Sequence, residues 1–523
     1  MFIYRKFPKE DNKRYKTQRR TTCTFKKTFI AMSSKVYFAL VVFCCTYALL
    51  KADALTTKRP NIIFILADDL GWNDVSFHGS SQIPTPHIDA IGQRGAYLNA
   101  YYTQPVCSPT RATLMTGRSV IRTGVYDPVL EGNKGDLSLN FTMLPQLLKK
   151  FGYTNHMVGK WHLGMSSMKF TPLGRGFDTY TAGYLAGAED YWTHGHADGG
   201  NPTVLDFWNG TEPQYGFTCQ RADACPYRKY STHVFAEEAT RIIRGHEGDS
   251  NPFFMYLAFQ GVHAPLLAPQ AYIDSFNSTI ENPKRRIFAG MVKALDEGIG
   301  NVTRTLTETG QLDDTLVIFS TDNGGPADFF NRNMASNWPL RGMKRTLFEG
   351  GVRAVGAIAG AGINRKGDIL DGLVHVADFL PSIISSLGGN VKDLGNQDGD
   401  GIDVWAYLSG ASDSSPRNEI LHEAHPEGST DGNGNALRMG IYKIVLRSGS
   451  QWSTGSRVES NDGWYGGPGS SDPHYEGAYT LPTGAKTQPW SVHCPPPLQI
   501  LKQVLHANDG RKAKRRRARA FSM

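Results

Sequence analysis

The sequence predicts an α/β fold in which helices cover both faces of one large β-sheet. Four candidate strands support this prediction, at residues 61–67, 153–158, 253–259 and 315–320. The first, third and fourth are almost free of polar side chains, as expected for strands that are buried on both faces. Stretches with helical periodicity separate the candidate strands. Beyond residue 400 the pattern changes to short alternating segments, which predict a second, smaller sheet.

The expected elements follow one another along the chain. Helices are predicted at 87–95, around Leu114 and at 143–151, between the first two strands. Residues 164–230 are rich in Gly, Tyr, Asp and Pro, so we expect long loops there. Helices at 232–245 and 285–309 flank the third strand, and a helix at 374–387 follows the fourth.

The predicted domain boundary lies near residue 400, in a stretch rich in Gly and Asp. Alternating segments at 419–422 and 437–446 then predict the small antiparallel sheet. The expected organisation is a basic leader at 1–54, a large domain at 55–400, a small α+β domain at 401–490 and a basic tail at 491–523.

The net charge of +8 is concentrated at the two ends of the 523-residue chain. Residues 1–54 contain twelve Lys and Arg against three Asp and Glu, and seven basic residues lie between Arg511 and Arg519. The body between them is acidic, which argues against a nucleic-acid-binding protein. Two interpretations of the tail stay open: a site for heparin-like polyanions, or a disordered end produced by altered splicing or an incorrect gene model.

The leader is expected to direct the chain into the secretory pathway. Residues 36–50 form an apolar run, too short for a spanning helix of roughly 20 residues, and Ala52-Asp53-Ala54 follows as a cleavage pattern. Met32 would be a more ordinary start for such a leader than Met1. We expect cleavage, a lysosomal or extracellular destination and no membrane association afterwards; an uncleaved signal anchor is the alternative.

Glycosylation and cysteine usage agree with secretory entry. The four N-glycosylation sequons begin at Asn140, Asn209, Asn277 and Asn301. Cys219 and Cys225 are close together in a polar segment, and we expect them to pair with each other.

Carboxylates follow the first and fourth predicted strands, as Asp68-Asp69 and Asp322-Asn323. Adjacent strand residues point to opposite faces, so two neighbours reach one ion only where the strand ends. This hard oxygen-donor set suits Ca²⁺ or Mg²⁺ better than Zn²⁺. The alternative is that these residues only cap helices and form turns.

Lys160 and His162 follow the second predicted strand, in Gly-Lys-Trp-His-Leu-Gly. Two positions apart in an extended segment, they would face the same side. A lysine suits a fixed anion, and a histidine suits proton transfer or hydrogen bonding. A solvated lysine beside a packed histidine is the alternative.

The most informative stretch runs from Cys107 to Arg118, with the pattern Cys-x-Pro-x-Arg and a Thr-Gly-Arg end. As bare chemistry, Cys107 is open to four interpretations: a buried apolar thiol, half of a disulfide, a metal ligand or a nucleophile. Arg111 would lie one helical turn away, where its charge stabilises an anion beside Cys107.

This stretch resembles the signature of the type I sulfatases, in which the cysteine is oxidised to formylglycine by a formylglycine-generating enzyme in the endoplasmic reticulum. Leu-Ala-Asp-Asp-Leu-Gly and Ser-Thr-Asp-Asn-Gly-Gly resemble the segments of the family that bind calcium, and Gly-Lys-Trp-His-Leu-Gly resembles its second signature. The resemblance spans roughly residues 58–450. Residues 256–263 point to the arylsulfatase B-like branch, N-acetylgalactosamine-4-sulfatase.

The resemblance implies an alkaline-phosphatase-like fold with a large mixed sheet, and a site that hydrolyses sulfate esters. One Ca²⁺ would be held by Asp68, Asp69, Asp322, Asn323 and the modified Cys107. The residues implied to contact the sulfate, the nucleophile or the leaving oxygen are Arg111, Lys160, His162, His263 and Lys344. In the family, one hydroxyl of the hydrated aldehyde attacks sulfur, and the second allows sulfate to be expelled.

The expected substrate is N-acetylgalactosamine 4-sulfate in glycosaminoglycans, or an aryl sulfate. Two alternatives remain. One is a phosphodiesterase or phosphonate hydrolase of the same wider fold. The other is a secreted homologue that binds polysaccharide without turnover.

Overall fold

A computed structural model describes residues 59–130, 135–195, 204–214, 229–327, 333–393, 395, 399–424 and 434–448. The chain divides into two compact units, Met1–Lys58 and Arg59–Met523, and all described residues belong to the second. The leader at 1–54, the Cys219–Cys225 pair and the tail at 491–523 lie outside the described residues, so these remain predictions.

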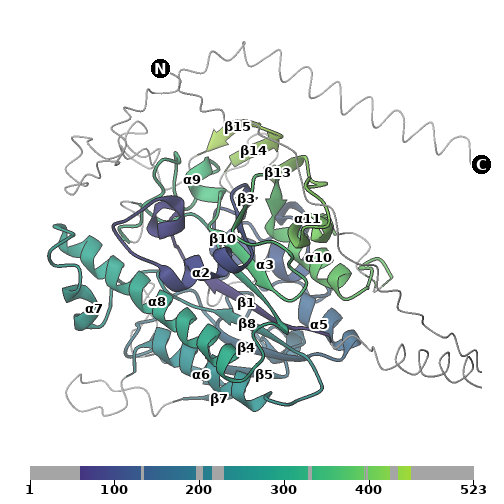
Figure 1. The fold of residues 1–523 in the computed structure, drawn as a ribbon, viewed down its shortest axis with the longest axis horizontal. Coiled ribbons are helices and arrows are strands. Elements are labelled where there is room, and N and C mark those ends of the chain that lie inside the picture. The colour runs from purple at the N-terminus through teal and green to yellow at the C-terminus, as the bar shows by residue number, and fades with distance from the viewer. Residues whose placement is uncertain are drawn as a thin grey trace, which may run out of the picture. The chain divides into compact units, whose positions relative to one another are not determined.

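A ten-stranded mixed sheet forms the centre of the second unit (Figure 1). Five neighbouring strands run parallel: β9 (Thr315–Thr321), β1 (Asn61–Ala67), β8 (Phe253–Ala258), β4 (Thr154–Lys160) and β5 (Thr179–Tyr184). Four of them are the strands predicted from the sequence, and β1 has the predicted bounds. The predicted fold class is therefore confirmed.

Shorter strands extend the sheet on both sides, and the sequence analysis did not predict them. Beyond β9 the order is β10 (Gly356–Gly360), β2 (Ala96–Leu98) and β11 (Asp368–Leu370); beyond β5 it is β6 (Trp208–Asn209) and β7 (Glu212–Pro213). The β10–β9, β10–β2, β5–β6 and β6–β7 pairs are antiparallel. The small residues of β10 and the two- or three-residue length of the others leave too weak a sequence pattern to predict a strand.

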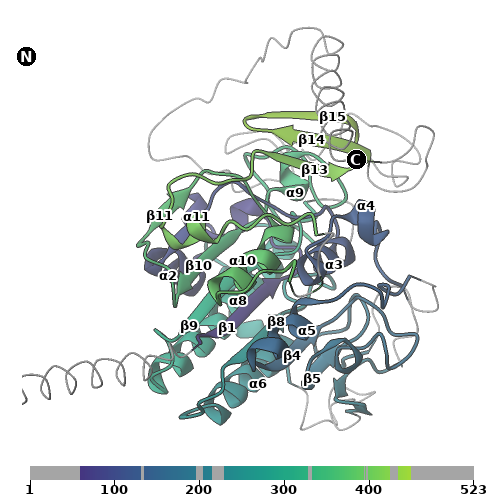
Figure 2. The same cartoon turned by 90° about the vertical axis from the view of Figure 1, so that its right-hand side faces the viewer.

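Two hydrophobic cores cover the two faces of the sheet. Alternate residues of β1 point to opposite faces, so Ile63 and Ile65 lie in one core, and Ile62 and Phe64 in the other. The helices that contribute to the first core are α2 (Pro86–Arg94), α6 (Ser231–Gly245) and α8 (Pro283–Glu308), and those of the second are α3 (Cys107–Thr116), α5 (Leu144–Leu148) and α10 (Phe379–Ser386). Figures 1 and 2 show these helices from two directions.

The remaining short elements connect these layers. They are η1 (Trp72–Asp74), η2 (Ser76–His78), β3 (Tyr101–Tyr102), α4 (Val120–Thr123), η3 (Lys149–Phe151), η4 (Leu173–Arg175), α7 (Gln270–Asp274), α9 (Glu349–Val352), β12 (Val374–His375), η6 (Val376–Asp378) and α11 (Trp405–Ser409).

The predicted small antiparallel sheet is present near the C-terminal end of the described residues. It contains β13 (Glu419–Glu423), β14 (Gly434–Met439) and β15 (Tyr442–Ser448), in that order. Its Ile420 and Ala436 share a third hydrophobic cluster with Tyr102 and Val352. The domain limits at 400 and 490 stay predictions; Tyr407 of α11 packs in a core of the large sheet.

Two local predictions were wrong. The segment at 374–387 is not one helix, because β12 and η6 precede α10. His375 caps η6 by accepting a hydrogen bond from the Ala377 amide, which starts the helical turn later than the apolar pattern indicated. Residues 164–230 are not loops throughout, since the Thr- and Tyr-rich β5 lies there and pairs with β4.

Within the described part of the chain, every helix is either too short or too polar to cross a lipid bilayer.

Two histidines face each other at the amino-terminal side of β4. The Nε2 atoms of His156 and His246 are 2.8 Å apart. His156 Nδ1 contacts Thr179 Oγ1 at 2.7 Å, and His246 Nδ1 contacts the Asp249 carboxylate at 3.2 Å. A hydrogen bond between two imidazoles needs at least one neutral ring. Burial and the neighbouring His246 accordingly lower the pKa of His156 to about 4, from an ordinary value of 6.5.

This pair predicts a loss of stability in acid. Because the folded pKa of His156 lies below its unfolded value, its contribution is full above about pH 6.5 and is lost as the pH falls towards about 4. Between about pH 7.5 and pH 5 the free energy of unfolding should fall by about 1–2 kcal/mol from this group. His156→Gln should be less stable at the higher pH but should show a smaller change with pH. Equal pH slopes in chemical denaturation of both proteins would contradict this assignment.

Candidate active site

The candidate site lies where the parallel strands end. Asp68 and Asp69 follow β1, Lys160 ends β4, and Asp322 and Asn323 follow β9. Carboxyl ends of adjacent parallel strands meet at one edge of a sheet, where α/β proteins place their sites. β1 pairs with β9 and β8, and β4 pairs with β8, so residues far apart in the sequence come together here.

The four carboxylate and amide residues among the predicted metal ligands, Asp68, Asp69, Asp322 and Asn323, form one buried group. The Asp69 amide donates to Asp322 Oδ1 at 3.2 Å, and Asn323 Nδ2 donates to Asp69 Oδ1 at 2.7 Å. All four side chains are buried. Asp69 has a φ of 64°, a left-handed conformation that is rare outside glycine. The chain therefore turns immediately after β1, which is how neighbouring Asp68 and Asp69 both enter the site.

Cys107 is the first residue of α3, and its Sγ lies 3.4 Å from Asp68 Oδ1. The side chain is only 2% exposed. Burial, together with Asp322 and Asp68, raises the pKa of this thiol well above its usual range. An unmodified Cys107 is thus held as a neutral thiol, which is a weak nucleophile.

Two hydroxyl groups next to Cys107 fix the start of α3. Ser108 Oγ donates to the His162 carbonyl at 2.8 Å, and Thr110 Oγ1 donates to the Asp322 carbonyl at 2.5 Å. The sequence analysis did not single out either residue. Their position inside the Cys107–Arg118 stretch was the available signal, because a buried helix with several hydroxyl residues needs polar partners.

Arg111 lies one turn along α3 and is fully buried. Its Nη2 is 2.9 Å from Asp322 Oδ2 and 3.4 Å from Asp68 Oδ2, and its Nη1 donates to the Lys160 carbonyl at 3.0 Å. The prediction that its charge lies beside Cys107 fits this position. Its direct partners are the carboxylates, so it also fixes their geometry.

Two lysines and a histidine complete the polar cluster. Lys160 Nζ contacts Asp68 Oδ2, and Lys344 Nζ lies 2.8 Å from the Asp69 carboxylate. His263 Nε2 lies 3.5 Å from Asp69 Oδ2, while its Nδ1 faces the Ala264 carbonyl at 2.7 Å. Burial and Lys344 lower the pKa of His263. These three residues therefore lie in one cluster around Asp68 and Asp69, and their contacts with a sulfate ester stay a prediction.

His162 faces the same cluster from a different backbone conformation than expected. β4 ends at Lys160, and His162 has a φ of 58°, so the segment is not extended. Its ring is buried, and neither ring nitrogen has a hydrogen-bond partner among the described residues. Burial, Lys160 and Arg111 lower its pKa well below the usual range. A neutral imidazole in this position has a free nitrogen for a ligand.

The formal charges of the site are balanced. Burial opposes ionisation of Asp68, but Lys160, His263, Arg111 and Lys344 together hold its pKa low. Burial and the adjacent Asp68 instead raise the pKa of Asp322. Three carboxylates face three permanent cations, so a bound divalent cation would leave the site positive and favourable for an anion.

The donor set fits a hard divalent cation. Asp68 and Asp69 have ligand atoms within 4.8 Å of those of Cys107 and His263. Asn323 Oδ1 is a buried oxygen that has no hydrogen-bond partner among the described residues. Carboxylate and amide oxygens are the ligands that Ca²⁺ prefers. Asp68, Asp69, Asp322 and Asn323 would therefore hold the ion, which is a proposal that follows from their chemistry.

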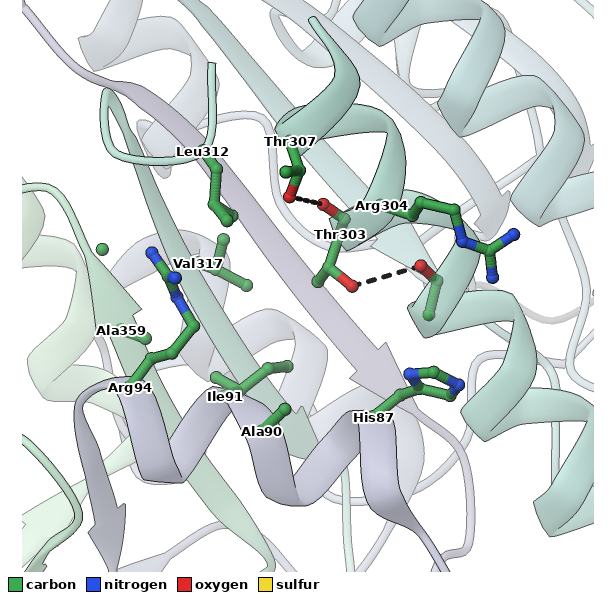
Figure 3. A pocket seen from close by; sticks show the side chains of 12 residues that line it. His87, Ala90, Ile91, Arg94, Thr303, Arg304, Thr307, Leu312, Val317 and Ala359 are labelled. Atoms are coloured by element: carbon green, nitrogen blue, oxygen red, sulfur yellow. Dashed lines mark hydrogen bonds between the residues drawn. The ribbon is translucent and has the colours of Figure 1, made fainter. Parts of the chain in front are cut away.

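A separate pocket of about 310 Å³ lies between α2, α8 and the sheet (Figure 3). Its walls include Ile91, Thr303 and Val317, with His87 and Arg94 from α2. None of the residues discussed above lines it. Its position next to the early residues of β9 places it away from the strand ends that form the candidate site.

The four predicted glycosylation sites are exposed. Asn140, Asn209, Asn277 and Asn301 all lie at the surface, and Asn301 is on α8. Their modification stays a prediction.

Comparison with known proteins identifies the family. The family model described as Sulfatase matches residues 60–389, which is more than half of the chain. The chain therefore belongs to the sulfatase family of sulfuric ester hydrolases, and the predicted membership is confirmed. The resemblance that the Cys107–Arg118 stretch suggested thus extends over the whole large sheet.

Individual relatives are similar in sequence and structure. Arylsulfatase J of Mus musculus is 37% identical over 416 residues, which cover 79% of this chain and 66% of the relative. N-acetylgalactosamine-6-sulfatase of Mus musculus is 30% identical over 375 residues, covering 70% and 69%. The chain thus spans about two thirds of the length of these curated relatives.

Solved structures agree. The crystal structure of Ps i-CgsB in complex with k-i-k-neocarrahexaose has a TM-score of 0.64 and 28% identity, and covers 74% of this chain and 84% of its own. The PsFucS1 sulfatase from Pseudoalteromonas sp. has a TM-score of 0.63 and 27% identity, and covers 77% and 81%.

The donor set predicts calcium binding that depends on Asp69. Asp69→Asn should weaken Ca²⁺ binding at least about tenfold, because it removes one of three carboxylates from the site. The measurement is isothermal titration of chelator-treated protein. Asp313→Asn is the control, since Asp313 is 93% exposed and pairs with Arg94. Unchanged affinity in the Asp69 variant would place the ion elsewhere.

Proposed function

We propose that this protein hydrolyses sulfate esters of N-acetylgalactosamine-containing glycosaminoglycans, with the 4-sulfate as the preferred ester. The observation that carries the proposal is the buried cluster in which Cys107 lies 3.4 Å from Asp68, within a charge-balanced set of carboxylates and cations. A sulfate ester is an anion that resists attack by nucleophiles. A site for it needs several fixed cations and a protected nucleophile, and this cluster contains both.

Three cations would bind the sulfate. Arg111, Lys160 and Lys344 are buried and already oriented by Asp68, Asp69 and Asp322. Because these side chains are held by ion pairs, little reorganisation is needed when an anion arrives. They act as electrostatic clamps on sulfate oxygens.

His263 and Lys344 are the candidates for protonating the leaving alcohol. His263 Nδ1 faces the Ala264 carbonyl, and its Nε2 points towards Asp69, into the cluster. A group in this position is close enough to the cluster to act as an acid or base towards a bound ligand. The His162 ring has no hydrogen-bond partner among the residues that the structure describes, and it would contact the nucleophile or its hydroxyl groups.

A metal ion and a modified side chain complete the proposal. Ca²⁺, held by Asp68, Asp69, Asp322 and Asn323, supplies positive charge to the sulfate oxygens. Formylglycine, made from Cys107 by the formylglycine-generating enzyme, supplies a hydrated aldehyde as the nucleophile.

The names of relatives support a sulfated sugar but not one ester position. The relatives compared include an arylsulfatase and an N-acetylgalactosamine-6-sulfatase, and one solved neighbour is a complex with neocarrahexaose. The preference for the 4-sulfate rests on the resemblance of residues 256–263 to the arylsulfatase B-like branch. The 6-sulfate is therefore the competing substrate that the experiment must include.

A panel of esters tests the activity. Purified protein whose Cys107 peptide has lost a sulfur and two hydrogens and gained an oxygen by mass spectrometry should hydrolyse an aryl sulfate and N-acetylgalactosamine 4-sulfate. It should hydrolyse phosphate monoesters and diesters much more slowly. Cys107→Ala should lower kcat by about a thousandfold or more.

Other outcomes select the alternatives. Faster cleavage of phosphate diesters or phosphonates would favour a phosphodiesterase or phosphonate hydrolase. Faster cleavage of the 6-sulfate would show that the 6-sulfate, and not the 4-sulfate, is the preferred ester. Formylglycine-containing protein that binds sulfated polysaccharide without any turnover would favour the non-catalytic homologue.

We also propose secretory synthesis, with delivery to the lysosome or the extracellular space. Exposed sequons at Asn140, Asn209, Asn277 and Asn301 support it. Protein from eukaryotic cells should lose mass on treatment with peptide-N-glycosidase. Asn301→Gln should lower the mass of the untreated protein by that of one N-linked glycan. Unglycosylated protein in the cytosol would contradict secretory entry.

A further inference from the structure

The small C-terminal sheet contacts α9 through the partly buried carboxylate of Glu349, beside the hydrophobic cluster of Ile420 and Ala436 with Tyr102 and Val352. Glu349 begins α9, five residues after Lys344. Its carboxylate accepts a hydrogen bond from the Tyr102 hydroxyl at 2.8 Å and pairs with Lys443 Nζ at 3.0 Å and Arg438 Nη1 at 3.4 Å. Arg438 and Lys443 are cross-strand partners on β14 and β15. The small sheet thus contributes two cations to one acidic residue of the large domain.

The cluster is largely shielded from water. The Glu349 side chain is 25% exposed, and those of Arg438 and Lys443 are 14% and 10% exposed. Burial disfavours the charged carboxylate, but Lys443, Arg438 and the Tyr102 hydroxyl outweigh it and lower the pKa of Glu349. Arg353 Nη1 also lies 3.9 Å from the Glu349 carboxylate, so three bases surround it. Removing the Glu349 charge would leave these shielded cations without their common partner.

α9 in turn touches the two loops that carry site residues. The Gly324 amide donates to the Gly351 carbonyl at 3.0 Å, directly after Asn323. The Gly350 amide donates to the Arg341 carbonyl at 2.6 Å, within the loop that leads to Lys344. A displacement of α9 would therefore be passed to Asn323 on one side and to the Lys344 loop on the other.

The glycines at these contacts have no space for a side chain. A Cβ on Gly324 would lie 1.7 Å from the Gly350 carbonyl oxygen, and one on Gly350 would lie 2.1 Å from the Gly342 carbonyl oxygen. Backbone packed this closely transmits a shift instead of absorbing it. Next to it, the Val352 carbonyl accepts a hydrogen bond from the Thr103 amide at 2.8 Å, in the segment that leads to Cys107.

From these contacts we propose that Glu349, Arg438 and Lys443 are positioning residues for the reaction. Through them, the small sheet would hold the loops that carry Asn323 and Lys344 in their catalytic positions. The cations of β14 and β15 hold Glu349, Glu349 holds α9, and α9 sets the positions of Asn323 and Lys344. None of the three touches the cluster around Cys107. The inference rests on the proposed sulfatase activity for its kinetic test, but not for its structural test.

Glu349→Gln is the central variant because the amide keeps the size of the side chain and removes its charge. Lys443→Met removes one cation, and Lys443→Arg keeps it. We expect Glu349→Gln and Lys443→Met to lower kcat by about ten- to a hundredfold, the range seen when supporting residues are removed or a site residue is misplaced by about 1 Å. KM should change less than about threefold. Lys443→Arg should retain most of the activity.

A double-variant cycle separates positioning from general destabilisation. If Lys443 acts through Glu349, adding Lys443→Met to Glu349→Gln should lower kcat little further. Arg365→Met is the matched control, since Arg365 is 9% exposed, pairs with Asp368 at 2.9 Å and contacts no site loop. Arg365→Met should lower the melting temperature by about as much as Glu349→Gln and Lys443→Met do, and it should leave kcat unchanged.

Hydrogen–deuterium exchange provides a readout independent of activity. Peptides covering 321–327 and 340–352 should exchange faster in Glu349→Gln and Lys443→Met than in the wild-type protein or in Arg365→Met. Unchanged exchange in both peptides would overturn the proposal, as would effects on kcat that multiply in the double variant. If the wild-type protein cleaved no sulfate ester, the proposed function would fail, and exchange would still decide whether these residues position the loops.

Discussion

The structure depends on the neutralisation of three buried carboxylates where parallel strands end. Asp68, Asp69 and Asp322 would repel one another in a dry interior, and several kcal/mol per ion would be lost if they were unpaired. Arg111 and Lys160 prevent this by direct contact with Asp68, and Lys344 by contact with Asp69. A ligand of the site must keep these charges compensated. A bound cation would be held by the carboxylates, and a bound anion by the arginine and lysine side chains.

This balance explains why the supporting structure is built so closely around the site. α3 is attached at its first turn through Ser108 and Thr110, which bond to the carbonyls of His162 and Asp322. Asp69 and His162 adopt left-handed backbone conformations at the ends of their strands. Such conformations persist only where surrounding contacts determine them, and they are frequent at functional sites. The strained backbone aims each side chain inward where a regular strand would alternate faces.

Membership of the sulfatase family and the geometry of the site support the same chemistry from independent directions. The family model covers 60–389, which includes every residue of the cluster around Cys107. The small sheet lies outside that match, yet its Arg438 and Lys443 reach Glu349 inside it. Residues outside the family match are therefore in direct contact with α9, which lies next to the loops that carry Asn323 and Lys344.

The sequence alone predicted the central parallel strands and named the polar residues that cluster at their ends. Continuous apolar runs such as 61–67 mark strands buried on both faces, and Asp68-Asp69 and Asp322-Asn323 mark their ends, because local hydrophobicity and spacing encode both features. The short β10 and β2 were not predictable, since their pairing comes from neighbours far away in the chain. Only the tertiary structure decided which cation faces which carboxylate, and that Arg438 and Lys443 lie against Glu349. Those contacts join residues up to 275 positions apart, as for Lys344 and Asp69, and no local pattern specifies them.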